Sequence, residues 1–400
     1  MGWVRPFVIR LKEKERDIEP FLVIPPCQYA SGREKEIAEN FPEIKFVLGP
    51  RDYLKYVFWG RFCSPFPREI GRGVCVFLGG DPFHAVLISR RLKVPAVAYL
   101  QNPRWRKRFE KFLVRDEKVK RKNFIERGVS PEKVIVVGDL MVDSILYQVK
   151  NEEISENLSF AKGFVSIMPG SRSSIACNMT YFFLKTCEFI MEEIPDIGFS
   201  LILSPFLKID DFFNLEKAKI KKEVGPLKVE LTGKEGRWQL LTSKGLKVDI
   251  VERERYHVMK LSTLALTIPG TNTAQLACLG VPMVVTVPLS MPEYIPLDGF
   301  AGIVGNFPFI GKVVKRKIVE KYNKAIKFCA IPNMHAGREI VPEMRGKITP
   351  EDVAKVAVEL LKDRKRLSRT SFELKKIMGE GGAADKVSDV ILEMLKKREG

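Results

Sequence analysis

Two loops combine glycine with hydroxyl and cationic side chains, a combination suited to binding phosphate. The first loop follows the apolar run Phe164–Met168 and contains Gly170, Ser171 and Arg172. A glycine lets backbone N–H groups approach an anion closely, and a guanidinium can hold two phosphate oxygens with its planar fork. The loop therefore predicts a phosphate or diphosphate site, although a plain turn after a strand would use the same residues.

The second loop has the same form. An apolar run precedes Gly270, Thr271 and Asn272, and a helix that carries Gln275 is expected to follow. The N-terminus of such a helix offers unpaired N–H groups and the positive end of its dipole to a diphosphate. Thr271 or Asn272 could cap this helix, and a plain helix cap is the alternative interpretation.

A third segment, 331–343, gathers polar side chains around two prolines and a glycine. Asn333, Arg338, Glu339 and Glu343 alternate there with apolar residues, and a long amphipathic helix is expected after them. Turn-forming residues beside concentrated polar groups are how a loop presents fixed ligands to a substrate. An ordinary surface loop with helix caps is the alternative.

The N-terminal half has fewer residues suited to catalysis. Asp81 follows the apolar run Val74–Leu78, and His84 lies three residues later. A carboxylate at the carboxyl end of a strand could act as the general base that deprotonates an acceptor hydroxyl, with His84 as the second candidate. The alternative role for Asp81 is a turn or helix N-cap.

Cations alternate with aromatic residues in one basic segment. Its members are Arg104, Trp105, Arg106, Arg108 and Phe109. In a chain of net charge +18, such a segment could bind nucleic acid, a membrane surface or an anionic substrate, or it could be a solvated helix face whose aromatic residues pack inward. No nucleic-acid-binding motif accompanies it, so an anionic lipid or phosphorylated lipid is the preferred partner and nucleic acid is not expected.

Short β-branched runs alternate with amphipathic stretches along all 400 residues, which predicts an α/β fold with parallel sheets covered on both faces. The length favours two domains. We place them at 1–150 and 158–365, with a polar linker at 151–157 and further helices at 366–400. The simplest arrangement is two doubly wound, Rossmann-like domains that face a cleft, with ligands at the carboxyl ends of the strands. Trp3, Phe7 and Leu11 predict a helix at the start, whereas a doubly wound domain normally opens on a strand and a glycine-rich loop. Two interpretations stay open: this start is genuine, or the first strand of the N-terminal domain lies upstream of it.

Other features limit the class of protein. No apolar run reaches the roughly 18–20 residues of a transmembrane helix, and the first residues do not resemble a signal peptide. Seven cysteines without a Cys-x-x-Cys pair, and three histidines, favour free thiols in a reducing compartment and no structural zinc. We expect a cytoplasmic protein.

The three loops resemble those of the lipid-A-disaccharide synthase family. That family carries Pro-Gly-Ser-Arg after the first strand of its C-terminal domain, and Pro-Asn, Gly-Arg-Glu and Pro-Glu ahead of a long helix. The second loop is similar to the donor loop of GT-B enzymes that use UDP-sugars. This resemblance implies a GT-B fold, a last helix that crosses back to the first domain, and no metal or other cofactor beyond the UDP-sugar itself. It also implies inverting transfer from a UDP-linked donor of the UDP-N-acetylglucosamine type.

Within this resemblance, the donor contacts would come from the residues singled out above in the three loops. Asp81 matches the Asp of the family's Asp-Phe-Asn by position, and the acceptor, a lipid-linked or phosphorylated sugar, would meet the basic segment at the inner face of the membrane. Three positions depart from the family: Ile175 and Gln275 stand where Glu is usual, and Asp139 stands where His is usual. These losses leave open an alternative, a non-catalytic descendant that binds nucleotide sugars or serves as a scaffold.

Overall fold

A computed structural model describes residues 2–26, 32–59, 66, 70–152, 163–212, 215, 218–234, 236–288 and 326–397. The chain forms two compact units, one made of Met1–Gln148 with Gly379–Gly400 and the other of Val149–Met378. The chain passes from the first unit to the second within α6 (Leu140–Asn151). Most of the linker predicted at 151–157 lies outside the described residues.

The first unit contains two parallel sheets among its described residues. β1 (Phe21–Val23) pairs with β2 (Phe46–Leu48), and the order of the second sheet is β3 (Cys75–Phe77), β4 (Ala96–Tyr99), β5 (Lys111–Val114) and β6 (Val134–Val136). Its described α-helices are α1 (Val4–Lys14), α2 (Glu34–Glu39), α3 (Pro50–Trp59), α4 (Pro82–Leu92), α5 (Glu117–Val119), α6 and α16 (Ala383–Lys396). The helix predicted at the start is confirmed as α1. β5 was not predicted, because its four residues follow directly on the basic segment.

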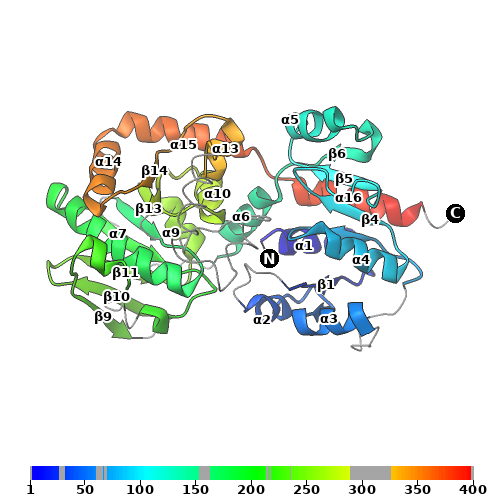
Figure 1. The fold of residues 1–400 in the computed structure, drawn as a ribbon, viewed down its shortest axis with the longest axis horizontal. Helices are drawn as coiled ribbons and strands as arrows, with labels where there is room; N and C mark the ends of the chain where they lie inside the picture. The colour runs from blue at the N-terminus through cyan, green and yellow to red at the C-terminus, as the bar shows by residue number, and fades with distance from the viewer. Residues whose placement is uncertain are drawn as a thin grey trace, which may run out of the picture. The chain divides into compact units, whose positions relative to one another are not determined.

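The two ends of the chain meet in the first unit. Phe7 and Leu11 of α1 pack with Val387 and Ile391 of α16 in one core cluster, which also includes residues of β4 and β5. Figure 1 shows α1 and α16 near this sheet. The last helix therefore buries an apolar face in the first unit.

The described strands of the second unit form one eight-stranded sheet. Its strand order is β14 (Glu343–Gly346), β13 (Met283–Pro288), β12 (Leu264–Thr267), β7 (Phe164–Met168), β8 (Gly198–Ile202), β11 (Lys247–Val251), β10 (Arg237–Thr242) and β9 (Val229–Lys234). The six strands from β14 to β11 are parallel, and β10 and β9 add an antiparallel edge. The parallel part has the doubly wound strand order, with a topological switch point between β7 and β12.

The described α-helices of the second unit are α7 (Ser173–Glu193), α8 (Lys221–Val224), α9 (Arg255–Leu261), α10 (Thr271–Leu279), α13 (Ile331–Ala336), α14 (Pro350–Lys362) and α15 (Arg364–Met378). The third segment, interpreted from the sequence as a loop, begins with the short helix α13 and runs into β14. No helix among the described residues is long and apolar enough to cross a membrane.

Candidate functional site

The two glycine-containing loops of the second unit lie at the switch point of the sheet. β7 and β12 are adjacent parallel strands, and Met168 at the end of β7 pairs with Thr267 at the end of β12. The loops that follow these strands therefore leave the same edge of the sheet next to each other. In open α/β sheets, ligands bind in the crevice at this position.

Direct contacts join the two loops. The Asn272 side-chain amide donates a hydrogen bond to the Met168 carbonyl at 3.4 Å, and the Thr267 hydroxyl donates to the same oxygen at 3.2 Å. Gly170 has φ +107°, and a Cβ at that position would lie 2.7 Å from Cδ1 of Ile268. A side chain at Gly170 would thus be strained and would also push the loops apart.

The N-termini of α7 and α10 open onto these loops. The N-caps are Arg172 for α7 and Gly270 for α10, and neither helix has a side-chain cap hydrogen bond. The prediction that Thr271 or Asn272 caps α10 is therefore wrong, because the helix begins at Thr271 itself. Without a side-chain cap, the first N–H groups of both helices are suited to bind phosphate oxygens.

Gln275 of α10 is held by a neighbouring helix. Its amide nitrogen donates to the Tyr256 hydroxyl at 3.1 Å, and no described residue donates to its amide oxygen, which can therefore accept from a ligand. Glu152 in turn accepts hydrogen bonds from the backbone N–H groups of Tyr256 and His257, at 3.1 and 2.8 Å. The sequence carried no signal for Tyr256, since it lies on α9 and meets Gln275 only in the folded chain.

Asn333 contacts its own loop instead of a ligand site. Its amide donates to the Val341 carbonyl at 2.8 Å and to Glu343 at 2.9 Å, and its oxygen accepts from the N–H groups of Ile340 and Val341. These bonds use all four hydrogen-bonding positions of the amide, and the residue is 0% exposed. The prediction that Asn333 contacts the donor is corrected: this side chain fixes the shape of the third segment.

Glu343 is a second buried anchor of the same segment. Its carboxylate accepts from the backbone N–H groups of Cys329 and Ala330, with distances of 2.8–3.0 Å, and it lies 3.5 Å from the Arg345 guanidinium. The segment is tied to α10 by the Ile331 N–H, which donates to the Thr273 hydroxyl at 3.1 Å. All three loops thus meet around the N-terminal end of α10.

Arg338 and Glu339 are exposed at the far end of the third segment. Arg338 pairs with Glu373 of α15, with 2.9 Å between Nη2 and Oε2. A ligand would have to displace or share this ion pair to use Arg338.

The first unit brings Asp81 and the basic segment together. Asp81 is the N-cap of α4 and accepts a hydrogen bond from the Phe83 N–H at 2.9 Å. Its second oxygen accepts from Arg104 Nη2, also at 2.9 Å. Asp81 is therefore a helix N-cap, as its alternative interpretation predicted. It also pairs with a cation of the basic segment, which the sequence assigned to the acceptor.

An aromatic pair and a histidine lie beside this ion pair. Phe83 and Trp105 are 40% and 45% exposed, and their ring centroids are 5.4 Å apart. His84 Nδ1 lies 2.6 Å from the hydroxyl of Tyr53, which belongs to α3. Burial lowers the pKa of His84, while the nearby Asp81 raises it to a smaller extent. Tyr53 was missed because nothing in its local sequence distinguishes it from a core tyrosine.

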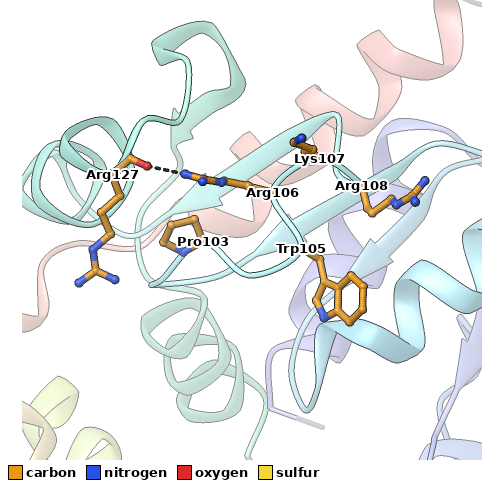
Figure 2. Close-up of a pocket in the computed structure, with 6 residues that line it drawn as sticks. All are labelled: Pro103, Trp105, Arg106, Lys107, Arg108 and Arg127. Atoms are coloured by element: carbon orange, nitrogen blue, oxygen red, sulfur yellow. Dashed lines mark hydrogen bonds between the residues drawn. The ribbon is translucent and has the colours of Figure 1, made fainter.

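The basic segment forms a loop that leads into β5. Pro103, Trp105, Arg106, Lys107, Arg108 and Arg127 line an open pocket of about 480 Å³. Figure 2 shows Arg106 reaching toward the carbonyl oxygen of Arg127, a hydrogen bond of 2.6 Å, while the Trp105 ring points away from it. Phe109 is 2% exposed and packs in the core, so its predicted role in an acceptor or membrane contact is corrected.

No family model matches the chain. Its curated relatives include the lipid-A-disaccharide synthases of Persephonella marina and Geobacter sulfurreducens, both 26% identical, over 66% and 69% of this chain. The matches span 59% and 60% of the length of those two proteins. The chain is thus a distant homologue of lipid-A-disaccharide synthases.

Solved structures with the same fold cover nearly the whole chain. Staphylococcus aureus MnaA with UDP has a TM-score of 0.56 at 14% identity, covering 99% of this chain and 94% of that one. The UDP-GlcNAc 2-epimerase of Neisseria meningitidis bound to UDP-GlcNAc has a TM-score of 0.53 at 13% identity, covering 99% and 96%. The wall teichoic acid polymerase TagF has a TM-score of 0.51 at 10% identity, covering 100% of this chain and 86% of that one. These neighbours establish that the α/β fold is of the GT-B class.

Proposed function

We propose that this protein is an inverting glycosyltransferase that moves a sugar from a UDP-linked donor, of the UDP-N-acetylglucosamine type, to a lipid-linked or phosphorylated sugar. The acceptor hydroxyl attacks the anomeric carbon, the bond to the diphosphate breaks, and Asp81 takes the hydroxyl proton. UDP leaves with the negative charge that Arg172 and the N-termini of α7 and α10 stabilise.

The convergence of three loops at the switch point of the second unit is the observation that carries this proposal. Two helix N-termini without side-chain caps, the Gly170 turn and Arg172 gather there, and each is suited to phosphate oxygens. The distant relatives are named lipid-A-disaccharide synthases, and two structural neighbours are complexes with UDP or UDP-GlcNAc. The structural neighbours favour a nucleotide sugar as the donor, and the relatives' name is consistent with a saccharide product.

The acceptor side of the proposal rests on the first unit. Asp81 offers a carboxylate within hydrogen-bonding distance of Arg104, and Phe83 with Trp105 offers an exposed apolar surface. Four cations line the adjacent pocket. An amphipathic, negatively charged acceptor fits this combination, and it would bring the protein to the surface of an anionic membrane as a peripheral partner.

The second candidate is a non-catalytic protein that retains nucleotide-sugar binding. Ile175 and Gln275 favour it, because neither residue provides the carboxylate that the resemblance leads one to expect. Gln275 nevertheless keeps an acceptor oxygen while its nitrogen is bound to Tyr256. Binding of UDP is common to both candidates, and sugar transfer separates them.

Calorimetric titration with UDP and UDP-N-acetylglucosamine tests the donor site. We expect saturable binding that is weakened at least tenfold in Arg172→Ala, since a charge-assisted hydrogen bond contributes about 1.5–3 kcal/mol. Arg237→Ala is the matched control, because Arg237 is exposed on β10 near the far edge of the same sheet. Failure of the wild-type protein to bind any uridine nucleotide would refute the proposed function.

A further inference from the structure

A hydrogen bond joins Tyr53 to His84, and its direction is linked to the nitrogen of His84 that carries the proton. Tyr53 is 2% exposed, and its hydroxyl oxygen lies 2.6 Å from His84 Nδ1. The two rings meet edge to face, with centroids 5.2 Å apart. Burial raises the pKa of Tyr53 to about 12, so the hydroxyl keeps its hydrogen at neutral pH.

Two arrangements of hydrogen are compatible with this distance. In one, Tyr53 donates to a bare Nδ1, and the neutral ring carries its hydrogen on Nε2. In the other, Nδ1–H donates to the Tyr53 oxygen, and the buried hydroxyl hydrogen needs a further acceptor. Among the described residues His84 is the one hydrogen-bond partner of this hydroxyl, so the first arrangement leaves no buried donor unpaired.

The charged groups around His84 agree with a neutral ring. Asp81, at the start of the same helix, is the carboxylate that acts on it, and that carboxylate is already paired with Arg104. From α3, the Tyr53 hydroxyl is the group that contacts the His84 ring. A neutral imidazole that accepts at Nδ1 has no lone pair at Nε2, so it can donate a hydrogen bond there but cannot take a proton there.

We propose that Tyr53 is a positioning residue that holds His84 in the Nε2–H tautomer, so that His84 donates a hydrogen bond to an acceptor oxygen while Asp81 takes the proton. The part of this proposal that concerns the acceptor rests on the proposed function, whereas the tautomer does not. It removes His84 from the candidates for general base and gives the two neighbouring residues opposite roles. The oxygen bound by His84 would belong to a hydroxyl or a phosphate of the acceptor.

Nuclear magnetic resonance of histidine-labelled protein tests the tautomer without any substrate. The chain has three histidines, so each ring can be followed through a pH titration, and His84→Gln assigns the resonances. We expect the Nε2–H form in the wild-type protein. In Tyr53→Phe we expect both tautomers and a rise in the pKa of His84 of about half a unit to one unit, because the neutral ring loses a hydrogen bond.

Tyr56→Phe is the matched control. Tyr56 lies one turn further along α3, is 1% exposed, and its hydroxyl has no hydrogen-bond partner among the described residues. Its removal should leave the tautomer and the pKa of His84 as in the wild type. The Nδ1–H tautomer in the wild-type protein, or identical titrations of His84 in Tyr53→Phe and Tyr56→Phe, would overturn the proposal.

A second comparison tests whether His84 acts as a hydrogen-bond donor during sugar transfer. His84→Gln keeps an amide N–H near the position of Nε2, whereas His84→Ala has no donor. We expect His84→Gln to retain at least ten times the kcat/KM of His84→Ala toward the acceptor, and equal losses would contradict donation. If no transfer can be detected even in the wild type, the resonance measurements still decide the role of Tyr53, so the two failures remain distinguishable.

Discussion

Asp81 makes two structural contacts and is also the proposed base, so its roles can be separated by substitution. Its cap contact requires one side-chain oxygen for the Phe83 N–H, which an amide also provides. Its ion pair with Arg104 is largely exposed to solvent, and such pairs contribute little to stability. An amide therefore loses only the weak ion pair among the structural contacts, whereas the role of proton acceptor requires the carboxylate.

Asp81→Asn should therefore leave the fold intact while it removes transfer. We expect the free energy of unfolding to change by less than about 1 kcal/mol, and kcat to fall by about 10²–10⁴. Asp116→Asn is the matched control, because Asp116 also caps a helix, α5, and pairs with an arginine, Arg115. Transfer rates and urea unfolding of both variants provide the measurement, and full transfer by Asp81→Asn would exclude Asp81 as the base.

Asn333 is expected to stabilise the fold through its buried hydrogen bonds within the third segment. Asn333→Ala would leave the N–H groups of Ile340 and Val341 and the Val341 carbonyl without this partner in a buried segment, and it would remove one of the donors to Glu343. We expect a loss of about 2–4 kcal/mol in the free energy of unfolding, measured by urea denaturation. Met334→Ala, one residue further along α13 and 57% exposed, should change it by less than about 0.5 kcal/mol. Similar losses in both variants would contradict the anchoring role.

At the scale of elements, the last helix is attached to the first unit by a cap from another helix. The Asp143 carboxylate on α6 accepts hydrogen bonds from the N–H groups of Gly382, Ala383 and Ala384, at 2.7, 2.8 and 3.3 Å. Gly138 lies against the same end, since a Cβ there would be 3.2 Å from the Cβ of Ala383. A carboxylate at a helix N-terminus satisfies unpaired N–H groups and complements the helix dipole.

Asp143→Ala should loosen α16. We expect a loss of about 1–2 kcal/mol in stability and faster amide hydrogen exchange along α16, because three backbone N–H groups lose their acceptor. Asp389→Ala removes an exposed carboxylate of the same helix that pairs with Lys14, and it should cost less than about 1 kcal/mol. Unchanged exchange along α16 in Asp143→Ala would show that the packing of its apolar face holds the helix without this cap.

At the scale of the whole molecule, the net charge of +18 is the property most relevant to a membrane partner. The pocket near Trp105 joins four cations to an exposed indole, and each cation near an anionic surface contributes about 1 kcal/mol to binding. General charge attraction and a specific binding surface make different predictions. If charge attraction alone causes membrane binding, removal of any two exposed cations should weaken it equally. If this pocket is a specific surface, removal of its own cations should weaken binding more.

Sedimentation with lipid vesicles separates these two cases. We expect the protein to bind vesicles that contain phosphatidylglycerol, not vesicles of phosphatidylcholine alone, with affinity that falls as salt rises. Lys107→Ala with Arg108→Ala should weaken binding about 30-fold, which corresponds to about 2 kcal/mol. Lys221→Ala with Lys222→Ala, an exposed pair on α8 of the second unit, is the control. Equal weakening in both double variants would argue for charge attraction alone.

The sequence by itself determined the features that depend on neighbours along the chain. Apolar runs predicted most of the parallel strands, and the residues after β7 and β12 identified the two loops that meet at the switch point. These features are local because a strand, a turn and a helix start each depend on a few consecutive residues. β5 was missed because a basic segment adjoins its four residues.

Only the tertiary structure decided which polar side chains remain available to a ligand. Asn333 and Gln275 carry similar amides. All four hydrogen-bonding positions of Asn333 are used by its own loop, whereas Gln275 uses its nitrogen to bond Tyr256 and has no described donor to its oxygen. Likewise, the pairing of Asp81 with Arg104 and of His84 with Tyr53 joins residues 23 and 31 positions apart. A hydrogen bond depends on distance in space, and periodicity along the chain does not specify which distant residues come within 3 Å.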